Sequence, residues 1–217
     1  MLTIDEIKKI INDDRASKKK RLARVGKKYY DGIHDIKNYR LFYYNTDGNL
    51  VEDTSRSNIK ISHPFFTEIV DQAVQYMLSS KNGYVKSNIP ELQKQLDLYF
   101  NNNETFKSEL YELLTDCMVK GYSYMHVHRT HDDRVTFQCA DSLGVVEVEA
   151  RFASDKKEHI IYHYIDWIDK DGKQVTRIRD YDDKEVRFYI QYGDGKIELD
   201  KDEEFNPLQY NLYRKKK

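Results

Sequence analysis

Residues 57–84 read SNIKISHPFFTEIVDQAVQYMLSSKNGY, and this stretch carries the clearest helical signal in the chain. Ser62 can accept a hydrogen bond at a helix N-terminus, and Pro64 suits the first turn, where its missing N–H is not needed. Six apolar residues then recur at intervals of three and four, which places them on one helical face. They are Phe66, Ile69, Val70, Ala73, Val74 and Met77. We expect all six to point inward and to make this segment a core helix.

Three other segments also show helix signals. Thr3 and Glu6 form a capping box, so a first helix begins there. A helix is expected over about 89–100, and Asn103 can cap another that ends at Gly121. The apolar stripe of this last helix consists of Phe106, Leu110, Leu113, Leu114, Cys117 and Met118. Residues 1–121 therefore contain several amphipathic helices.

The apolar period changes to two after Gly121, which indicates strands. The expected strands are 122–129, 135–139, 145–150, 160–168, 175–181 and 186–192. Turn sequences such as HDDR, DKDGK and YGDGK separate several of them, as in an antiparallel β meander. Helices followed by strands predict an α+β fold.

The chain divides by pattern into four regions. Residues 1–57 hold the N-terminal helix, a basic block and a tyrosine-rich loop region, within which we expect a mobile loop near 45–57. Residues 58–121 are helical, 122–199 form the antiparallel β region, and 200–217 form a charged tail. We expect residues 58–199 to make one folded unit.

Composition limits the possible functions. Among 217 residues, 36 are basic and 37 acidic, so the formal net charge of -1 argues against a dedicated nucleic-acid binder with a wholly basic surface. The 18 tyrosines and 9 phenylalanines supply apolar surface that a mean hydropathy of -0.83 conceals. No apolar run is long enough for a membrane span, and the N-terminus does not read as a signal peptide. We expect a folded protein that is cytosolic when made.

The two cysteines, Cys117 and Cys139, make neither a disulfide framework nor a CxxC pair. We expect Cys117 to be a buried thiol on the apolar face of its helix. No redox role follows from either residue.

One segment is strongly basic and contains no acid between residues 15 and 28. Its cations are Arg15, Lys18, Lys19, Lys20, Arg21, Arg24, Lys27 and Lys28. Two interpretations remain open for this basic block. It is a solvated helix face, which we favour, or it contacts an anionic partner such as double-stranded DNA without sequence specificity.

The segment from His126 to Asp132 comes close to the HxHxDH zinc motif, but Thr130 stands where that motif needs an aspartate. We interpret His126 and His128 as exposed histidines on one face of a strand. The turn aspartates Asp132, Asp133, Asp182 and Asp183 could in principle pair around magnesium, as in a nuclease. The sequence contains no recognisable nucleophile motif or nucleotide-binding loop, so we predict no enzyme, no cofactor and no metal.

Three sequence elements lie in order along the chain. The first is YYDGIHDI at 29–36, and the third is LTDCMVKGYSY at 114–124. The second joins Asn58, His63 and Phe65 to IVD at 69–71 and YML at 76–78. Together they resemble the N-terminal portion of tailed-phage portal proteins of the siphophage type, the ring-shaped head–tail connectors. The resemblance covers roughly residues 29–150, and about the first half of a portal subunit.

That resemblance implies a structural role in the outer wing of the connector. Portal proteins form rings, usually dodecamers, at one capsid vertex, and DNA is packaged and ejected through them. The implied partners are other portal subunits, capsid, scaffolding, packaging-motor and neck proteins, and double-stranded DNA, with no membrane. The implied location is the head–tail vertex of the virion, and the host cytoplasm during assembly.

Two alternatives stay open. The chain could be a short portal-like binding module that joins a portal ring or interferes with it. It could also be a metal-dependent enzyme that processes nucleic acid, which the motifs favour less.

Overall fold

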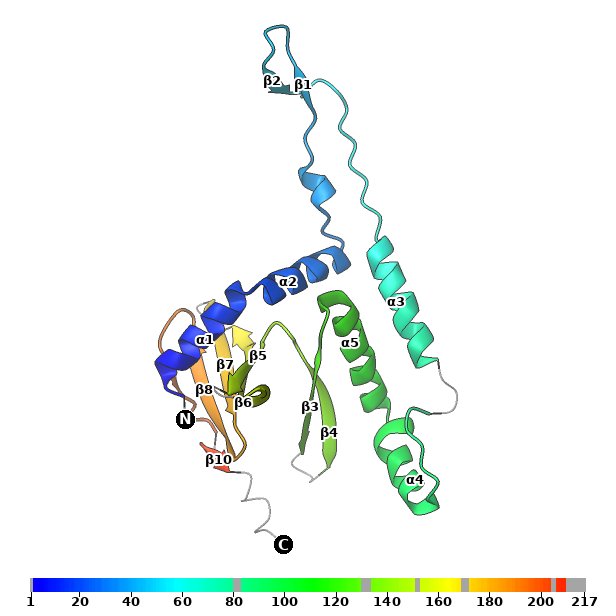
Figure 1. Cartoon of the computed structure of the whole chain (residues 1–217), viewed down its shortest axis with the longest axis vertical. Helices are drawn as coiled ribbons and strands as arrows, with labels where there is room; N and C mark the ends of the chain where they lie inside the picture. Colours follow the sequence, from blue (N-terminus) through cyan, green and yellow to red (C-terminus); the bar gives the residue numbers. More distant parts are fainter. Residues whose placement is uncertain are drawn as a thin grey trace.

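The computed structural model describes residues 2–79, 83–129, 134–150, 153–168, 172–203 and 206–209. It has an α+β architecture, as the sequence predicts. Figure 1 shows a body of helices and strands from which a long arm extends between α2 and α3. None of the described helices is long and apolar enough to cross a lipid bilayer.

The helices begin and end largely where the capping residues predict. Their bounds are α1 Ile4–Ala16, α2 Lys18–Tyr30, α3 Phe65–Leu78, α4 Pro90–Leu96 and α5 Glu104–Lys120, with a π-helical turn at Asp97–Asn101. The Thr3–Glu6 capping box forms, and the Asn103 side chain accepts from the Phe106 N–H. Gly121 ends α5 in the left-handed conformation, with φ of 82°.

Helix α3 corrects two predictions. It begins at Phe65 rather than near Ser62, and Pro64 precedes it without a side-chain cap. Val70 and Val74 are buried against Val119 of α5, but Ile69 is 63% exposed and Met77 is 47% exposed. The reason is that α5 and α2 cover only one side of α3. Ile69 lies about 100° around the helix from Val70, and Met77 lies in the last turn.

Four strands form the meander of the larger sheet. They are β5 Val145–Ala150, β6 Ala153–Ile168, β7 Gln174–Tyr181 and β8 Glu185–Tyr192. Each is antiparallel to the next, with Ile161 opposite Asp180 and Ile178 opposite Tyr189. Two short strands, β9 Ile197–Leu199 and β10 Leu208–Gln209, both pair with β8.

The prediction of one meander over 122–199 was wrong in one respect, because two sheets form. Strands β3 Tyr124–Arg129 and β4 Val135–Ala140 make a separate hairpin that packs on α5. Between the sheets the chain turns at Asp141, whose carboxylate accepts from Lys120 Nζ at 2.8 Å. Gly144 then lies against the β6 backbone, where a Cβ would be 2.2 Å from the carbonyl oxygen of His163. This turn redirects the strand instead of extending the first hairpin.

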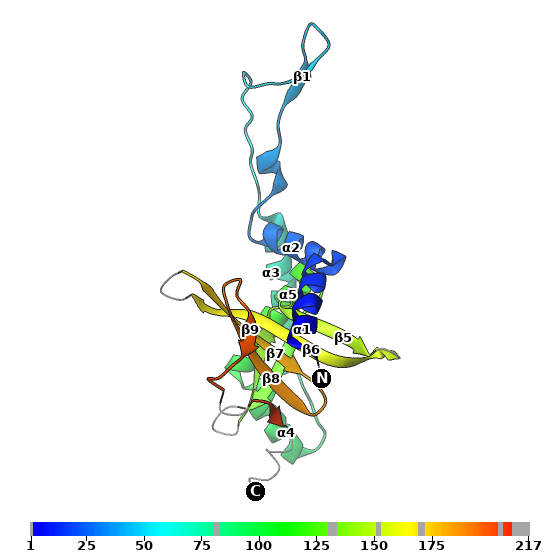
Figure 2. The ribbon, with the colours of Figure 1, turned by 90° about the vertical axis from the view of Figure 1, so that its left-hand side faces the viewer.

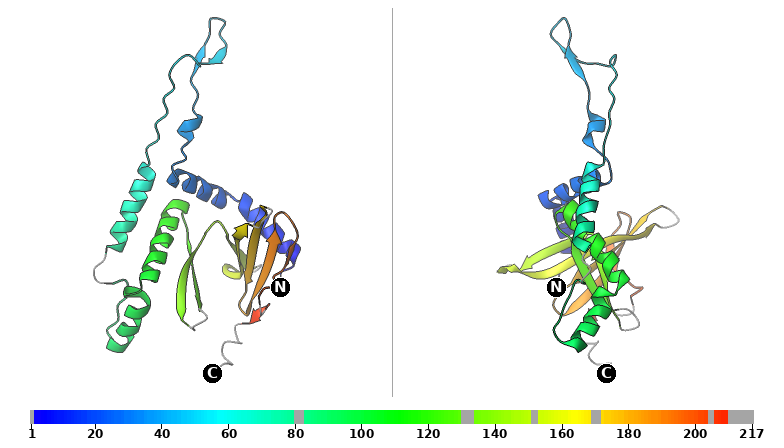
Figure 3. Two further views of the ribbon diagram at one scale, coloured as in Figure 1. Left: turned by 180° about the vertical axis from the view of Figure 1, so that it is seen from behind. Right: turned by 90° about the vertical axis from the view of Figure 1, so that its right-hand side faces the viewer.

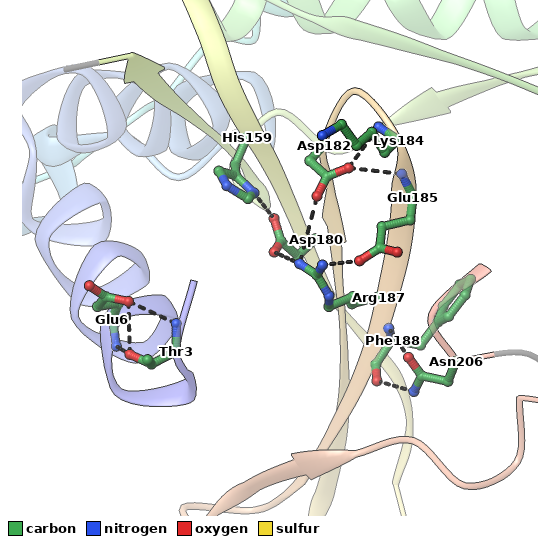
Figure 4. Close-up of polar contacts among 10 residues, drawn as sticks. All are labelled: Thr3, Glu6, His159, Asp180, Asp182, Lys184, Glu185, Arg187, Phe188 and Asn206. Atoms are coloured by element: carbon green, nitrogen blue, oxygen red, sulfur yellow. Dashed lines mark hydrogen bonds and ion pairs between the residues drawn. The ribbon is translucent and has the colours of Figure 1, made fainter. Parts of the chain in front are cut away.

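Helix α1 lies across the larger sheet (Figures 1 and 2). Ile7 and Ile11 of α1 pack with apolar residues from five different segments of the sheet, forming the main core. Those partners are Val146, Ile161, Ile178, Tyr189 and Ile197. The N-terminal helix therefore packs on the sheet, and β10 is one of its strands. Both lie outside residues 58–199, the range in which the sequence predicts a single folded unit. The Asn206 amide also bonds the N–H and C=O of Phe188, at 3.1 and 2.7 Å (Figure 4).

Candidate functional site: a projecting arm and a basic helix

Residues 31–64, here called the arm, leave the body between α2 and α3 (Figures 1 and 3). The arm contains a 3₁₀ turn at Asp35–Asn38 and a hairpin of β1 Phe42–Tyr44 and β2 Leu50–Glu52. At the tip, Asn45 Oδ1 accepts from the N–H groups of Asp47 and Asn49 at 3.0 and 2.9 Å. The tip is therefore an ordered turn.

This hairpin corrects the prediction of a mobile loop near 45–57, because β2 lies inside that range. A usable signal was present. Asp47–Gly48 stands between the apolar runs FYY and LVE, which is a typical hairpin pattern. Gly48 has φ of 77°, the conformation that such a turn requires and that glycine adopts at no steric cost.

Polar contacts join the arm's two limbs and fix its root. Lys60 Nζ donates to the carbonyl of Lys37 at 3.0 Å, and the Asn58 amide donates to the carbonyl of Tyr39 at 3.3 Å. At the root, the Tyr30 hydroxyl donates to Asp71 of α3 at 2.7 Å. Burial, together with this hydrogen bond, raises the pKa of Tyr30 to about 12. The arm thus has a defined direction relative to the body.

Most of the arm's apolar side chains are exposed, by between 37% and 78% of their surface. Tyr44 is 73% exposed and Ile59 is 78% exposed. The exposed apolar residues of the arm are Ile33, Ile36, Tyr39, Phe42, Tyr43, Tyr44, Leu50, Val51, Ile59 and Ile61. An uncovered aromatic surface of this extent is typical of a protein–protein interface.

The basic block folds as the end of α1 and most of α2, and its members differ in environment. Lys20 is buried, contradicting its assignment as a surface contact. Its Nζ donates to the carbonyls of Ser142 and Val145 at 2.5 and 2.6 Å and lies 3.2 Å from Asp14. Burial lowers the pKa of Lys20, and the charge of Asp14 opposes that shift. This lysine joins α2 to the loop before β5.

Several other cations of the block have partners within the chain. Lys19 lies over the Tyr122 ring, 3.9 Å from its centroid, and Arg24 donates to the carbonyl of Arg15 at 2.6 Å. Lys27 pairs with Asp31 at 3.2 Å, and Lys28 pairs with Asp35. The exposed members are Arg15, Lys18, Lys19, Arg21, Arg24 and Lys27. These six residues form a moderately basic face, and contacts within the chain already engage some of their charges.

The histidine motif does not form a metal site among the described residues. His126 and His128 stack with ring centroids 5.0 Å apart, and both are half-buried rather than exposed as predicted. Burial, His128 and Arg179 together lower the pKa of His126, and its Nε2 lies 3.4 Å from the Tyr181 hydroxyl. The described residues include no group of three or more His, Cys, Asp or Glu side chains placed to hold a metal. Thr130, His131, Asp132 and Asp133 lie outside the described residues.

The proposed magnesium carboxylates include Asp182, whose contacts are those of a turn. Its Oδ1 accepts from the N–H groups of Lys184 and Glu185, both at 2.8 Å. Its Oδ2 lies 3.7 Å from Arg187, which also pairs with Glu185 and lies 3.8 Å from buried Asp180. His159 completes this network through a 2.8 Å contact to Asp180 (Figure 4). The network joins β6, β7 and β8, and its carboxylates are occupied by protein partners.

The two cysteines lie in different environments. Cys117 is exposed, contrary to the expected burial, because the face of α5 that carries it is not covered in the described part of the chain. Cys139 is half-buried, and burial together with nearby carboxylates raises the pKa of its thiol to about 12. The features that stand out are therefore surfaces for association.

An α+β body that carries an uncovered aromatic arm is the architecture of a protein with surfaces for association. The chain belongs to the phage portal protein family, since residues 8–214 match the family model described as phage portal protein, SPP1 Gp6-like. The portal protein of Bacillus phage SPP1 is 24% identical to this chain over 182 residues, 81% of the chain and 34% of that protein. The chain thus spans about a third of the length of this curated relative. The predicted portal resemblance is confirmed.

Proposed function

We propose that this chain is the N-terminal, wing-like part of a portal subunit, the ring at the capsid vertex through which DNA is packaged and ejected. The observation that supports this most is the family match over residues 8–214, which takes in both sheets, all or most of every described helix and the whole arm. The proposed role is structural. The network of His159, Asp180, Asp182, Glu185 and Arg187 is consistent with it, because these side chains contact one another and backbone groups.

The proposed partners are other portal subunits in a closed ring, together with capsid, scaffolding, packaging-motor and neck proteins. The proposed location is the head–tail vertex of the virion, and the host cytoplasm during assembly. The exposed cations of the basic block are proposed as a weak, non-specific contact for double-stranded DNA or another anionic partner. Lys20 is excluded from that set because it is buried.

We also propose that 58–199 acts as one unit to which α1 and β10 are attached. The contacts of Ile7 and Ile11 with the sheet, and the pairing of β10 with β8, support that grouping.

Electron microscopy and native mass spectrometry of the purified chain test the portal proposal. We expect closed rings of a single subunit number, since head-to-tail contacts of fixed geometry close a ring. A chain that remains monomeric at all accessible concentrations, and that does not enter rings of a full-length portal protein when co-expressed with it, would contradict the proposal.

The same experiment addresses the alternative of a short portal-like module. A module of that kind would enter or disrupt full-length rings without forming rings alone. Incubation with plasmid DNA and Mg²⁺ tests the enzyme alternative, which requires cleavage that EDTA abolishes.

A further inference from the structure

The chain carries two uncovered apolar surfaces in different places. The first is the arm's hairpin, with Tyr39, Phe42, Tyr43, Tyr44 and Leu50 exposed. The second, here called the α3 face, consists of Phe65, Ile69 and Tyr76. These three residues fall at i, i+4 and i+11, so they form one stripe about 120° away from the buried stripe through Val70. Tyr76 is 82% exposed.

The two surfaces cannot cover each other within one chain. The hairpin lies at the far end of the arm, and α3 runs away from it along the body (Figures 1 and 3). An extended chain rises at most ~3.3–3.6 Å per residue, so the limb from Asp31 to Asp47 can carry the tip no more than roughly 55 Å from its root. That reach exceeds the radius of gyration of a compact body of this size, which is about 17 Å.

The exposed aromatic side chains supply a substantial part of the area that a specific interface needs. Aromatic side chains each bury about 150–250 Å² on contact, and six of them on the two surfaces are roughly half to four fifths exposed. The four on the hairpin present roughly 470 Å² and the two on the α3 face roughly 290 Å², together about half of the ~1,600 Å² that a standard interface buries on both partners. These six are Tyr39, Phe42, Tyr43, Tyr44, Phe65 and Tyr76.

We propose that the arm of one copy of this chain lies on the α3 face of the next copy. This contact rests on the proposed ring function and names the surfaces that make it. It is head-to-tail, because the hairpin and the α3 face are different surfaces, and each copy then has both surfaces covered. Repetition of one such contact closes a ring if the rotation is right.

Charge supports a second copy over a strongly charged partner. The arm contains five acids and four bases, and several of these pair within it. Arg40 lies 3.3 Å from Glu52, and Arg56 lies 3.0 Å from Asp53. A nearly neutral aromatic surface fits another apolar surface and has no excess charge to attract DNA. The last described strand, β10, lies at the opposite end of the molecule from the hairpin (Figure 1).

Complementation between two defective variants tests the proposal. One variant carries Phe42→Ser and Tyr44→Ser in the hairpin, and the other carries Ile69→Ser and Tyr76→Ser on the α3 face. We expect each to weaken self-association at least tenfold in sedimentation velocity, because exposed aromatic residues dominate such interfaces. The α3-face variant still has an intact hairpin, and the hairpin variant still has an intact α3 face. Mixed together they should therefore form a one-to-one dimer that does not grow.

Photo-cross-linking identifies the contact directly. Tyr44 is replaced by benzoylphenylalanine, and light-isotope chains that carry it are mixed with heavy-isotope unsubstituted chains. We expect light-to-heavy cross-linked peptides within residues 65–78. Leu199→Ser, at an apolar residue on β9 that is 52% exposed, is the control and should leave association unchanged.

The outcomes separate the two proposals. Rings that persist in both double variants, or cross-links confined to single chains or to two hairpins, would overturn the arm contact and leave the portal function standing. An unsubstituted chain that neither associates nor cross-links would overturn the arm contact, and one that also fails to enter rings of a full-length portal protein would overturn both.

Discussion

The sheet body and the arm differ in where their apolar side chains find cover. In the body, Ile7, Ile161 and Ile178 are buried between α1 and the sheet. In the arm, Asp53 is the single buried side chain among residues 31–64, all of which the structure describes. A body of this kind is stable through its own core, whereas the arm keeps its form through backbone turns and polar links. The comparison indicates that the body folds alone and that the arm is completed by association.

The largest expected effect comes from opening the body's core. Ile161→Ala removes a fully buried side chain from the contact of α1 with the sheet. We expect a loss of about 2–5 kcal/mol in the free energy of unfolding, from lost burial and the cavity left behind. Denaturant unfolding followed by circular dichroism measures it, with Ile160→Ala, at a partly exposed neighbour on the same strand, as the control. Equal losses in the two variants would contradict the assigned core.

The second prediction separates the buried lysine of the basic block from its exposed neighbours. Lys20→Ala leaves Asp14 without its cation and the carbonyls of Ser142 and Val145 without their donor. We expect a loss of about 3 kcal/mol, since breaking a buried polar network leaves unpaired groups. Lys18→Ala, at an exposed position of the same helix, should change stability by less than about 0.5 kcal/mol. A similar small effect in both variants would show that Lys20 is not structural.

The third prediction concerns pH. Burial, with the charges of Arg15 and Lys20 nearby, lowers the pKa of His163 from its ordinary 6.5 to about 4. The unfolded chain therefore binds more protons than the folded chain between these values, and stability falls as pH falls through this window. We expect a loss of about 2 kcal/mol between pH 7 and pH 5 from this residue.

The measurement is the free energy of unfolding of the unsubstituted chain and of His163→Gln at both pH values. The variant should lose about 2 kcal/mol less than the unsubstituted chain over the same interval, because glutamine does not titrate there. Parallel pH curves for the two proteins would refute the assignment to His163.

The sequence predicted those features that depend on local chemistry. Capping residues located the starts of α1 and α5, Gly121 located the end of α5, and alternating apolar residues located six strands. The sequence did not predict how helix faces are covered, because that depends on tertiary neighbours. Ile69 and Val70 are adjacent apolar residues of one helix, yet only Val70 faces α5.

The candidate site shows the same limit. Eight cations in one segment gave no indication that Lys20 would turn inward, because its partners Ser142 and Val145 lie more than 120 residues away in the sequence. The exposed arm was unpredictable for a related reason. Its aromatic residues have the composition of a core segment, and sequence alone does not say whether the same chain or another one covers them.

The smallest expected effect is the one that tests the comparison most directly. At a concentration where the chain is monomeric, Phe42→Ser with Tyr44→Ser should change the free energy of unfolding by less than about 0.5 kcal/mol, since neither side chain is covered by the body. At concentrations where copies associate, the unsubstituted chain should gain stability that the variant lacks, because a partner that binds only the folded state stabilises it by mass action. Thermal unfolding across a concentration series distinguishes the two regimes. A large loss in the monomer would show that the hairpin is part of the body's own cooperative unit, and the contrast between arm and body would then fail.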